Sequence, residues 1–361
     1  MTDNPTPGRD RSVTVAAIRD FTERIDVRSP SEYTEDHLPG AVSHPVLDDN
    51  ERARIGIMHA QESAFAARRA GAALVARNIA TMLETSFATQ PRNWAPLVYC
   101  WRGGQRSRSL AHMLNEIGWR AAQLEGGYRA YRRHVVGELA TLPGRFRYEV
   151  ICGLTGSGKS RLIAALAREG AQVLDLEAMA RHRGSLLGDL PDQPQPTQKS
   201  FDSQLVAALE TYDPARPVYV ESESKKIGTV QLPDALLAAM RAADCIRIAL
   251  PQPLRIELLK SEYAHFLADH GALTARLRHL VPLHGKKTIE RWADAAKAGD
   301  WNTLVEELLA LHYDPTYTRS IGKNFPRFAG AIDVAPSALT DAAFGALARE
   351  LDARVRVRPA I

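Results

Sequence analysis

The sequence predicts two α/β domains, each built on a parallel sheet that helices cover on both faces. Strand-like and helix-like segments alternate along both halves of the chain, which is typical of parallel sheets. A Pro-Gly pair within residues 141–146 interrupts the pattern and predicts a linker. The 361 residues, of which 45% are hydrophobic, suffice for two domains of roughly 100 to 200 residues each. We expect one domain over residues 12–138 and a second over 146–361 that ends in a helical part.

In the first half, four apolar segments predict strands and three segments predict helices. Short runs rich in β-branched and other apolar residues predict the strands, and apolar residues at helical spacing predict the helices. A long Ala- and Arg-rich segment contains almost no helix breakers and predicts helix throughout. The expected order is strand 24–28, strand 40–46, helix from 51 to about 89, strand 96–100, helix 107–119, strand 120–126 and helix 127–139.

The second half repeats the alternation and then becomes helical. A Pro- and Gln-rich stretch over 190–198 predicts a surface loop. The expected order is strand 147–153, strand 171–177, strand 216–222, strand 244–250 and a helical segment from 253 to about 312. These elements predict a second parallel sheet followed by a helical extension.

Composition favours a cytoplasmic protein. The three cysteines are too few for a disulfide framework, and none forms a C-x-x-C pair that would indicate structural zinc. The first twelve residues are polar and are not typical of a signal peptide, and the apolar windows are too short to cross a bilayer. The formal charge of +4 permits an anionic partner without identifying one.

Cys100 stands where a nucleophile is expected in an α/β domain. It ends a predicted parallel strand, and the following helix directs its N-terminal N–H groups toward it. Those donors, with Arg102 and Arg106, would favour the thiolate and hold an anion beside the sulfur. Gly103 and Gly104 let the loop curl without Cβ clashes. The alternative is a small buried residue at a strand end.

The first half resembles rhodanese-like domains. The segment "IDVRSPSEYTEDHLPGAVSHPV" is similar to their opening, and "CWRGGQRS" lies where that family carries its persulfide cysteine. The resemblance covers residues 12–138. The loop from Cys100 to Arg106 is one residue longer than in simple thiosulfate sulfurtransferases, and it matches the C-x5-R-[ST] loop of cysteine-dependent phosphatases. However, Tyr99 replaces the histidine usual in those phosphatases, and no general-acid aspartate is evident.

The segment "GLTGSGKS" is a complete phosphate-binding motif at a strand-to-helix junction. Its backbone N–H groups, from about residue 155 to 160, would surround a diphosphate, and the lysine would neutralise its outer oxygens. Any diphosphate fits such a loop, so the motif does not identify ATP. The expected diphosphate-binding residues of the motif are Gly153, Thr155, Gly156, Ser157, Gly158, Lys159 and Ser160.

A Mg²⁺ site is expected beside this loop. The Ser160 hydroxyl would bind the ion, and a partner acid should end a neighbouring strand. Asp175 and either Glu221 or Glu223 occupy such positions, although each is also an ordinary place for an exposed charge. We expect no tightly bound cofactor beyond this possible Mg²⁺.

The second half resembles the tRNA 2-selenouridine synthase family, which fuses a rhodanese-like domain to a P-loop domain in this order. The resemblance lies in the P-loop and in residues 175–205 and 218–233, which contain the "HRGS" and "ESESKKIG" segments. It implies a transferase that acts on wobble 2-thiouridine in tRNA. In that family a geranyl group from geranyl diphosphate is first attached to sulfur, and selenium from selenophosphate then displaces it.

The resemblance also implies roles for particular residues. Cys100 would handle selenium, Arg102 and Arg106 would hold selenophosphate, and the P-loop with Arg183 would hold geranyl diphosphate. Apolar side chains are expected to form a trough beside the P-loop, and aromatic ones to stack on bases. The trough residues are Leu186, Leu187 and Leu190, the stacking residues are Tyr313, Tyr317 and Phe325, and the expected tRNA-binding residues are Lys225, Lys226, Lys286 and Lys287.

Two other functions fit part of the pattern. A cysteine phosphatase fused to a small-molecule kinase would use the same two loops, and a non-catalytic regulator could bind nucleotide and sulfide. We expect a tRNA-modifying monomer without membrane attachment.

Overall fold

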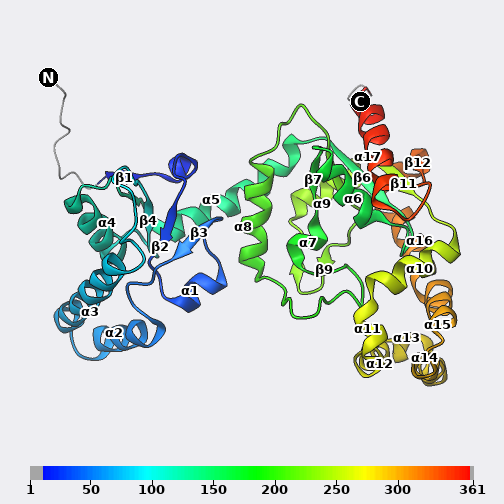
Figure 1. Ribbon diagram of the computed structural model, residues 1–361, viewed down its shortest axis with the longest axis horizontal. Coiled ribbons are helices and arrows are strands. Elements are labelled where there is room, and N and C mark those ends of the chain that lie inside the picture. The colour runs from blue at the N-terminus through cyan, green and yellow to red at the C-terminus, as the bar shows by residue number, and fades with distance from the viewer. Residues whose placement is uncertain (1–10, 358–361) are drawn as a thin grey trace. The chain divides into compact units, whose positions relative to one another are not determined.

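The computed structural model describes residues 11–357, which form two compact units (Figure 1). The first unit extends to Glu138 and includes Asp202–Ala207, and the second comprises Leu139–Phe201 and the chain from Ala208 onward. The segment predicted as a linker forms a short 3₁₀ helix, Leu142–Arg145. Most of the twelve residues judged unlike a signal peptide lie outside the described range.

The first unit contains a five-stranded parallel sheet in the order β1-β5-β4-β2-β3. The four predicted strands are present, and a fifth at the edge, β1, had no sequence signal. Because all strands are parallel, the segments that follow β2 and β4 leave the sheet at the same edge. The strands are β1 (Arg11–Val13), β2 (Arg24–Asp26), β3 (Ala41–Ser43), β4 (Leu97–Tyr99) and β5 (Ala122–Leu124).

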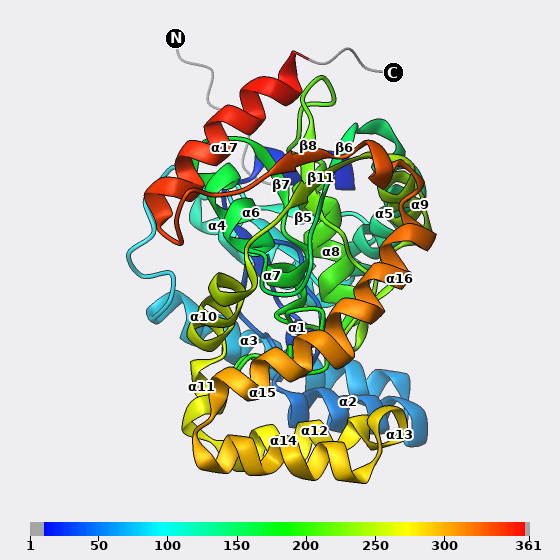
Figure 2. The ribbon, with the colours of Figure 1, turned by 90° about the vertical axis from the view of Figure 1, so that its right-hand side faces the viewer.

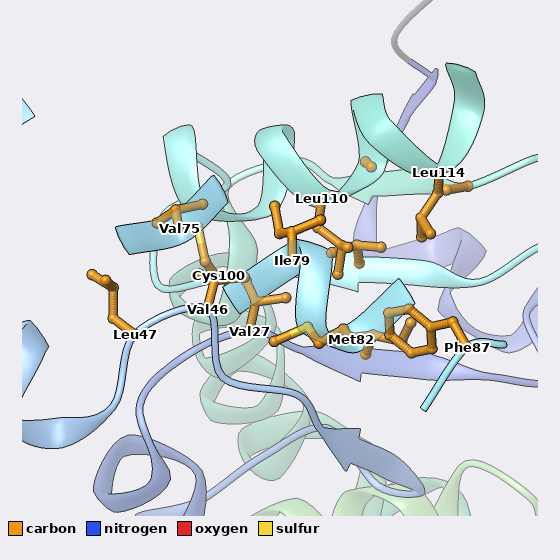
Figure 3. Close-up of a cluster of buried hydrophobic side chains, with 14 of the residues drawn as sticks. Val27, Val46, Leu47, Val75, Ile79, Met82, Phe87, Cys100, Leu110 and Leu114 are labelled. Atoms are coloured by element: carbon orange, nitrogen blue, oxygen red, sulfur yellow. The ribbon is translucent and has the colours of Figure 1, made fainter. Parts of the chain in front are cut away.

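Helices cover the sheet of the first unit. Side chains of α3 and α4, among them Ile79 and Leu110, pack on strand residues such as Ile25 and Val98 in one buried cluster (Figure 3). This burial of apolar surface is the main stabilisation of the unit. The helices are α1 (Pro30–Glu35), α2 (Asp49–Gln61), α3 (Ala64–Glu84), α4 (Gln105–Ile117) and α5 (Gly127–Thr141).

The segment predicted to be helical from 51 to about 89 is helical over most of its length, but it forms two helices, because α2 ends and α3 begins within it. Ser63 is the N-cap of α3, and its hydroxyl accepts a hydrogen bond from the Ala66 N–H at 3.0 Å. A serine side chain that bonds the backbone in this way favours a new helix start over continuation. The two helices then pack together, and a Cβ on Gly71 would lie 3.6 Å from Ile55.

A buried ion pair joins the end of β2 to the loop that follows it. Asp26 is fully buried and Arg28 is 1% exposed. The Arg28 guanidinium donates to both Asp26 oxygens, and its Nη2 also donates to the Asp36 carbonyl at 2.6 Å. The Cζ atom of the Arg28 guanidinium lies over the Tyr128 ring, 4.1 Å from its centroid. The pair therefore fixes this loop to α5.

The second unit contains a five-stranded parallel sheet in the order β12-β11-β6-β8-β7. The four predicted strands are present, whereas the edge strand β12 and the small β9-β10 hairpin were not predicted. The strands of the sheet are β6 (Tyr148–Cys152), β7 (Gln172–Leu174), β8 (Val218–Glu221), β11 (Asp244–Ile248) and β12 (Ile332–Val334), and the hairpin is β9 (Lys226–Ile227) with β10 (Val230–Gln231).

Two helices pack on one face of this sheet. Leu162 and Ile163 of α6 and Phe344 and Leu351 of α17 share a buried cluster with strand residues such as Ile246. Helix α9 contacts β6 and buries Leu236, Leu237 and Met240. The helices of this part are α6 (Lys159–Arg168), α7 (Leu176–Ala180), α9 (Asp234–Ala242) and α17 (Asp341–Arg356), whereas α8 (Gln198–Leu209) includes the Asp202–Ala207 segment of the first unit.

The predicted helical segment after β11 continues to Asn324. Side chains of α11, α12, α14 and α15 share a buried cluster with Trp292, and Figure 2 shows these helices, yellow to orange, grouped below the strands. No helix among residues 11–357 has the length and apolar character needed to cross a membrane. The elements are α10 (Gln252–Glu262), α11 (Ala264–Ala268), α12 (His270–Leu277), α13 (Val281–His284), α14 (Lys286–Ala298), α15 (Trp301–Leu308), a π-helical turn (Leu309–Tyr313) and α16 (Asp314–Asn324).

We predict that Arg28→Met lowers the free energy of unfolding of the first unit by about 3–5 kcal/mol, because it leaves the Asp26 charge buried without its partner. Urea unfolding followed by tryptophan fluorescence measures it. The control is Arg247→Met, since Arg247 is 47% exposed and its pair with Asp333 lies at the surface. Such a pair contributes about 0–1 kcal/mol. Equal effects of the two substitutions would contradict the importance of the buried pair.

Candidate functional site

The phosphate-binding loop lies between β6 and α6, as the sequence predicts. Gly156 and Gly158 have φ angles of +75° and +88°, which side-chain-bearing residues rarely adopt. A Cβ at Gly153 would lie 2.4 Å from the Ser157 hydroxyl oxygen, so that position admits only glycine. The Lys159 ammonium donates to the Gly153 carbonyl at 2.8 Å. The backbone is therefore curled as a diphosphate site requires.

The helical part holds this loop from behind. Arg255 is 5% exposed, and its Nε donates to the Thr155 carbonyl at 2.9 Å. Its two Nη atoms donate to the Asp314 carboxylate at 3.0 and 2.6 Å. The Tyr317 hydroxyl accepts the Gly153 N–H at 2.6 Å. Helices α10 and α16 therefore fix the position of the loop.

A cavity of about 350 Å³ opens at the loop. Arg183 lines it, as expected, and its guanidinium lies 4.8 Å from the centroid of the Tyr263 ring. The cavity also has an aromatic lining that the sequence did not locate. The residues Tyr313, Tyr317 and Phe325, which we expected to stack on bases, line it together with Tyr263 and His312.

Three carboxylates gather at one side of the cavity. Oxygens of Glu177, Glu221 and Glu223 lie within 4.8 Å of one another, and the Ser160 hydroxyl donates to Glu177 at 3.2 Å. Burial and the charge of Glu223 raise the pKa of Glu177 to about 8. Burial and the charge of Glu221 raise the pKa of Glu223 to about 7, and burial also raises the pKa of Glu221. Without a cation, this group holds protons near neutral pH.

The predicted metal residues divide into two sets. Glu221 is one of the three clustered carboxylates, and Ser160 contacts the cluster through its hydrogen bond to Glu177. Asp175 does not, because its side chain caps α7 and accepts the Ala178 N–H at 2.9 Å. Glu177, two residues further along, takes the place expected for Asp175.

A second, narrower cavity adjoins the first. The two share Thr155, Leu259, Tyr263 and Tyr313. Nearly all of the second lining is apolar, and most of it comes from the helical part: besides the shared residues it comprises Leu187, Lys260, Phe266, Leu267, Leu273, Trp301, Leu304, Val305, Leu308 and Leu309.

The predicted leucine trough is thus only partly formed. Leu186 lines the first cavity and Leu187 the second. Leu190 lines neither and lies instead at a polar hollow with Asp189 and Arg276. The helices after β11 supply the side chains that we expected from one loop.

Cys100 follows β4 and is 3% exposed. Its sulfur accepts hydrogen bonds from the Gly104 N–H at 3.3 Å and from the Ser107 hydroxyl at 3.1 Å. Gln123 donates to the same hydroxyl at 2.8 Å and to the Gly103 carbonyl at 2.9 Å. The apolar side chains around it are visible in Figure 3. Two neutral donors therefore face the sulfur, as negative charge on it would require.

The arginines of this loop do not form the expected pair of anion ligands. Arg106 donates to the Glu32 carboxylate at 2.8 Å, and both side chains are about one-fifth exposed. Arg102 is exposed. An anion at Cys100 would have to displace Glu32 from Arg106 to use both guanidinium groups.

The four lysines expected to bind tRNA are exposed and lie on separate segments. Lys225 and Lys226 lie at β9, and Lys286 and Lys287 begin α14. Lys225 pairs with Asp234 at 2.8 Å, and Lys286 pairs with Glu290 at 3.5 Å. None of the four lysines is among the residues that line the cavity.

Comparisons with known proteins agree with this two-unit arrangement. Residues 15–134 match the rhodanese-like domain family, and residues 146–279 match the family described as tRNA 2-selenouridine synthase AAA domain. Relatives from Nitrosomonas europaea, Aeromonas salmonicida and Bdellovibrio bacteriovorus, each named tRNA 2-selenouridine synthase, are 34%, 31% and 33% identical. The matches cover 77%, 84% and 82% of this chain and 72%, 88% and 88% of the relatives.

Proposed function

The chain belongs to the tRNA 2-selenouridine synthase family, and we propose that it converts wobble 2-thiouridine in tRNA to 2-selenouridine in two steps. The second unit transfers a geranyl group from geranyl diphosphate to the sulfur. Selenium from selenophosphate then displaces the geranylthio group with the participation of Cys100. Geranyl diphosphate and selenophosphate are both small anions. The proposed enzyme is a cytoplasmic monomer.

The observation that carries this proposal is the contact between the diphosphate loop and the apolar cavity. Thr155 of the loop lines both cavities, and so do Leu259 and Tyr263. Geranyl diphosphate has a charged head and a ten-carbon apolar tail. A loop of N–H donors beside an apolar cavity is complementary to both ends of such a molecule.

In the first step, a bond forms between the thiouridine sulfur and C1 of the geranyl group as the C1–O bond to diphosphate breaks. The uracil N3 proton leaves, so that the product is neutral. Negative charge grows on the departing diphosphate, where the loop N–H groups and Lys159 would stabilise it. Arg183 lines the same cavity and adds positive charge there.

In the second step, a C2–Se bond forms and the C2–S bond breaks, with geranylthiolate as the leaving group. The alkylated sulfur leaves more readily than an unmodified thio group. Water would cleave the Se–P bond of selenophosphate and release phosphate, so that selenium reaches C2 at the selenide level with no change of oxidation state; Cys100 would receive selenophosphate beside the reacting carbon, and the Gly104 and Ser107 donors would stabilise negative charge there. Arg102 and Arg106 would hold the phosphate of selenophosphate once Arg106 exchanges Glu32 for it.

Binding of tRNA requires positive charge outside the cavity and stacking within it. We assign the first role to Lys225, Lys226, Lys286 and Lys287, all of which are exposed. The aromatic side chains Tyr313, Tyr317 and Phe325 would stack on the target base.

We predict that Lys159→Ala slows geranyl transfer about 10²-fold or more, because the lysine meets charge on the departing diphosphate. Selenation of tRNA that is already geranylated should be retained. Nucleoside analysis of the product tRNA measures both steps. Lys323→Ala, which removes an exposed lysine on α16, is the control. Unchanged geranylation by Lys159→Ala would contradict the assigned role of the loop.

We predict the reverse pattern for Cys100→Ala: selenium incorporation is lost while geranylation continues, because only the second step uses a chalcogen nucleophile. The control is Cys245→Ala, which removes a buried free cysteine on β11. Equal loss of both activities in folded Cys100→Ala protein would contradict this division between the two units.

We predict that Leu187→Asp weakens geranyl diphosphate binding about tenfold or more, because it places a carboxylate in the apolar cavity. Pyrophosphate binding should not change, which also shows that the variant is folded. Leu187→Met, which keeps the site apolar, is the control. Calorimetry with geranyl diphosphate, pyrophosphate and ATP measures these affinities. Comparable ATP affinity in the unmodified protein, or ATP hydrolysis coupled to turnover, would favour the alternative of a kinase-like domain.

A further inference from the structure

We infer that the rim of the Cys100 loop is a binding surface for unpaired RNA, formed by Trp101, Arg129 and Arg133. The inference rests on the proposed function and deepens it, because the second step needs the target nucleoside beside Cys100. The lysines assigned to tRNA all lie in the second unit, so they leave this step without a surface that holds the RNA. Arg102, which would hold selenophosphate, is not part of this surface.

Contacts within the first unit place both arginines at the loop. The Arg129 N–H donates to the Trp101 carbonyl at 3.1 Å in the first turn of α5. Arg133 follows one turn later, and its Nη2 would lie 3.7 Å from a Cβ on Gly126. A Cβ on Gly103 of the loop would in turn lie 3.0 Å from the Gly126 nitrogen. The Arg133 guanidinium is therefore folded back toward the loop, and Arg129 begins at its edge.

Both arginines keep their positive charge available to a ligand. They are exposed, and within residues 11–357 no acidic side chain forms an ion pair with Arg129 or Arg133. Arg106 of the same loop differs, because Glu32 holds it at 2.8 Å. Glu125 is exposed just before α5 and is not paired with either arginine in this part of the chain. Guanidinium groups without a carboxylate partner are suited to phosphate oxygens.

An aromatic platform adjoins these charges. Trp101 is half-buried, and its ring stacks on that of Tyr128, with centroids 5.3 Å apart and planes inclined by 27°. Tyr128 is itself fixed, because its hydroxyl donates to Asp36 at 2.8 Å and the Arg28 guanidinium lies over its ring. The indole is therefore held in place before a ligand arrives, so a base that stacks on it costs little side-chain freedom.

The combination of ring and charge selects the partner. Proteins that bind unpaired RNA stack bases on aromatic side chains and pair the phosphates with basic ones. An acidic peptide would use the arginines but not the indole, and the faces of paired bases are covered within a duplex. Trp101 directly follows Cys100, so a base stacked on it belongs to the target nucleoside or to its neighbour.

Fluorescence anisotropy tests the indole. The full-length chain is titrated against a labelled anticodon stem-loop RNA with 2-thiouridine at the wobble position, without geranyl diphosphate or selenophosphate. Trp101→Ala should weaken binding about fivefold or more, which corresponds to the loss of one stacked base. Trp101→Phe keeps a ring at this position and should retain most of the affinity.

The salt dependence of binding tests the arginines. Each phosphate contact in single-stranded nucleic acid contributes about 0.7 to the slope of log K against log salt concentration. The double variant Arg129→Gln/Arg133→Gln should therefore reduce the magnitude of this slope by about 1.4. The control is Arg354→Gln, which removes an exposed arginine on α17 in the second unit and should leave the slope unchanged.

Three results would overturn the inference: unchanged RNA binding by both Trp101→Ala and the double arginine variant, equal affinity for a fully paired RNA duplex, and equally effective competition by polyglutamate. The arginine variant decides the matter if Trp101→Ala does not fold, since both arginine side chains are exposed. RNA binding that ignores the rim contradicts this inference alone. Absence of any RNA binding by the unmodified protein would contradict the proposed function as well.

Discussion

The hydrogen bonds of the buried Arg255 guanidinium are the interaction on which the site of the second unit depends. A phosphate-binding loop must direct its N–H groups into the cavity, which leaves its carbonyls to find partners behind it. Arg255 satisfies the Thr155 carbonyl, and Lys159 satisfies that of Gly153. Because Arg255 also holds the Asp314 carboxylate, the same side chain positions the start of α16 and its aromatic residues.

How far the site could be predicted depends on the separation of its parts along the chain. The loop from Gly153 to Ser160 is contiguous, so its pattern alone predicts its conformation and its place between a strand and a helix. Arg255 contacts Thr155 across 100 residues, and no local pattern marks either as a partner of the other. The aromatic lining and most of the apolar cavity come from the same distant helices, so the sequence predicts candidate residues but not their arrangement. Glu177 and Asp175 both lie at the end of one predicted strand, so the sequence could not show which of the two lies beside Glu221.

In the first unit, the sequence likewise did not predict the charge pairs, because their partners lie far apart along the chain. The position of Cys100 and the turn of Gly103 follow from the strand-loop-helix pattern, and both are found. The pairing of Arg106 with Glu32 links residues 74 positions apart, and it changes the expected anion site. The neutral donors Ser107 of α4 and Gln123 of β5 were missed because serine and glutamine are usually surface residues. Their burial is a consequence of the tertiary fold.

The electrostatics of the large cavity constrain how a nucleic acid can use it. The three carboxyl groups at one side of the cavity are not cations, so a polynucleotide backbone gains no charge pairing from them. A neutral base needs no such pairing, and the aromatic rings of Tyr313 and Tyr317 offer it stacking surfaces. If the proposed function holds, a splayed-out nucleoside whose phosphates stay outside is therefore the form of tRNA that suits the cavity. Lys226 and Lys287 are exposed and do not line the cavity, so they are not at the proposed reacting atoms.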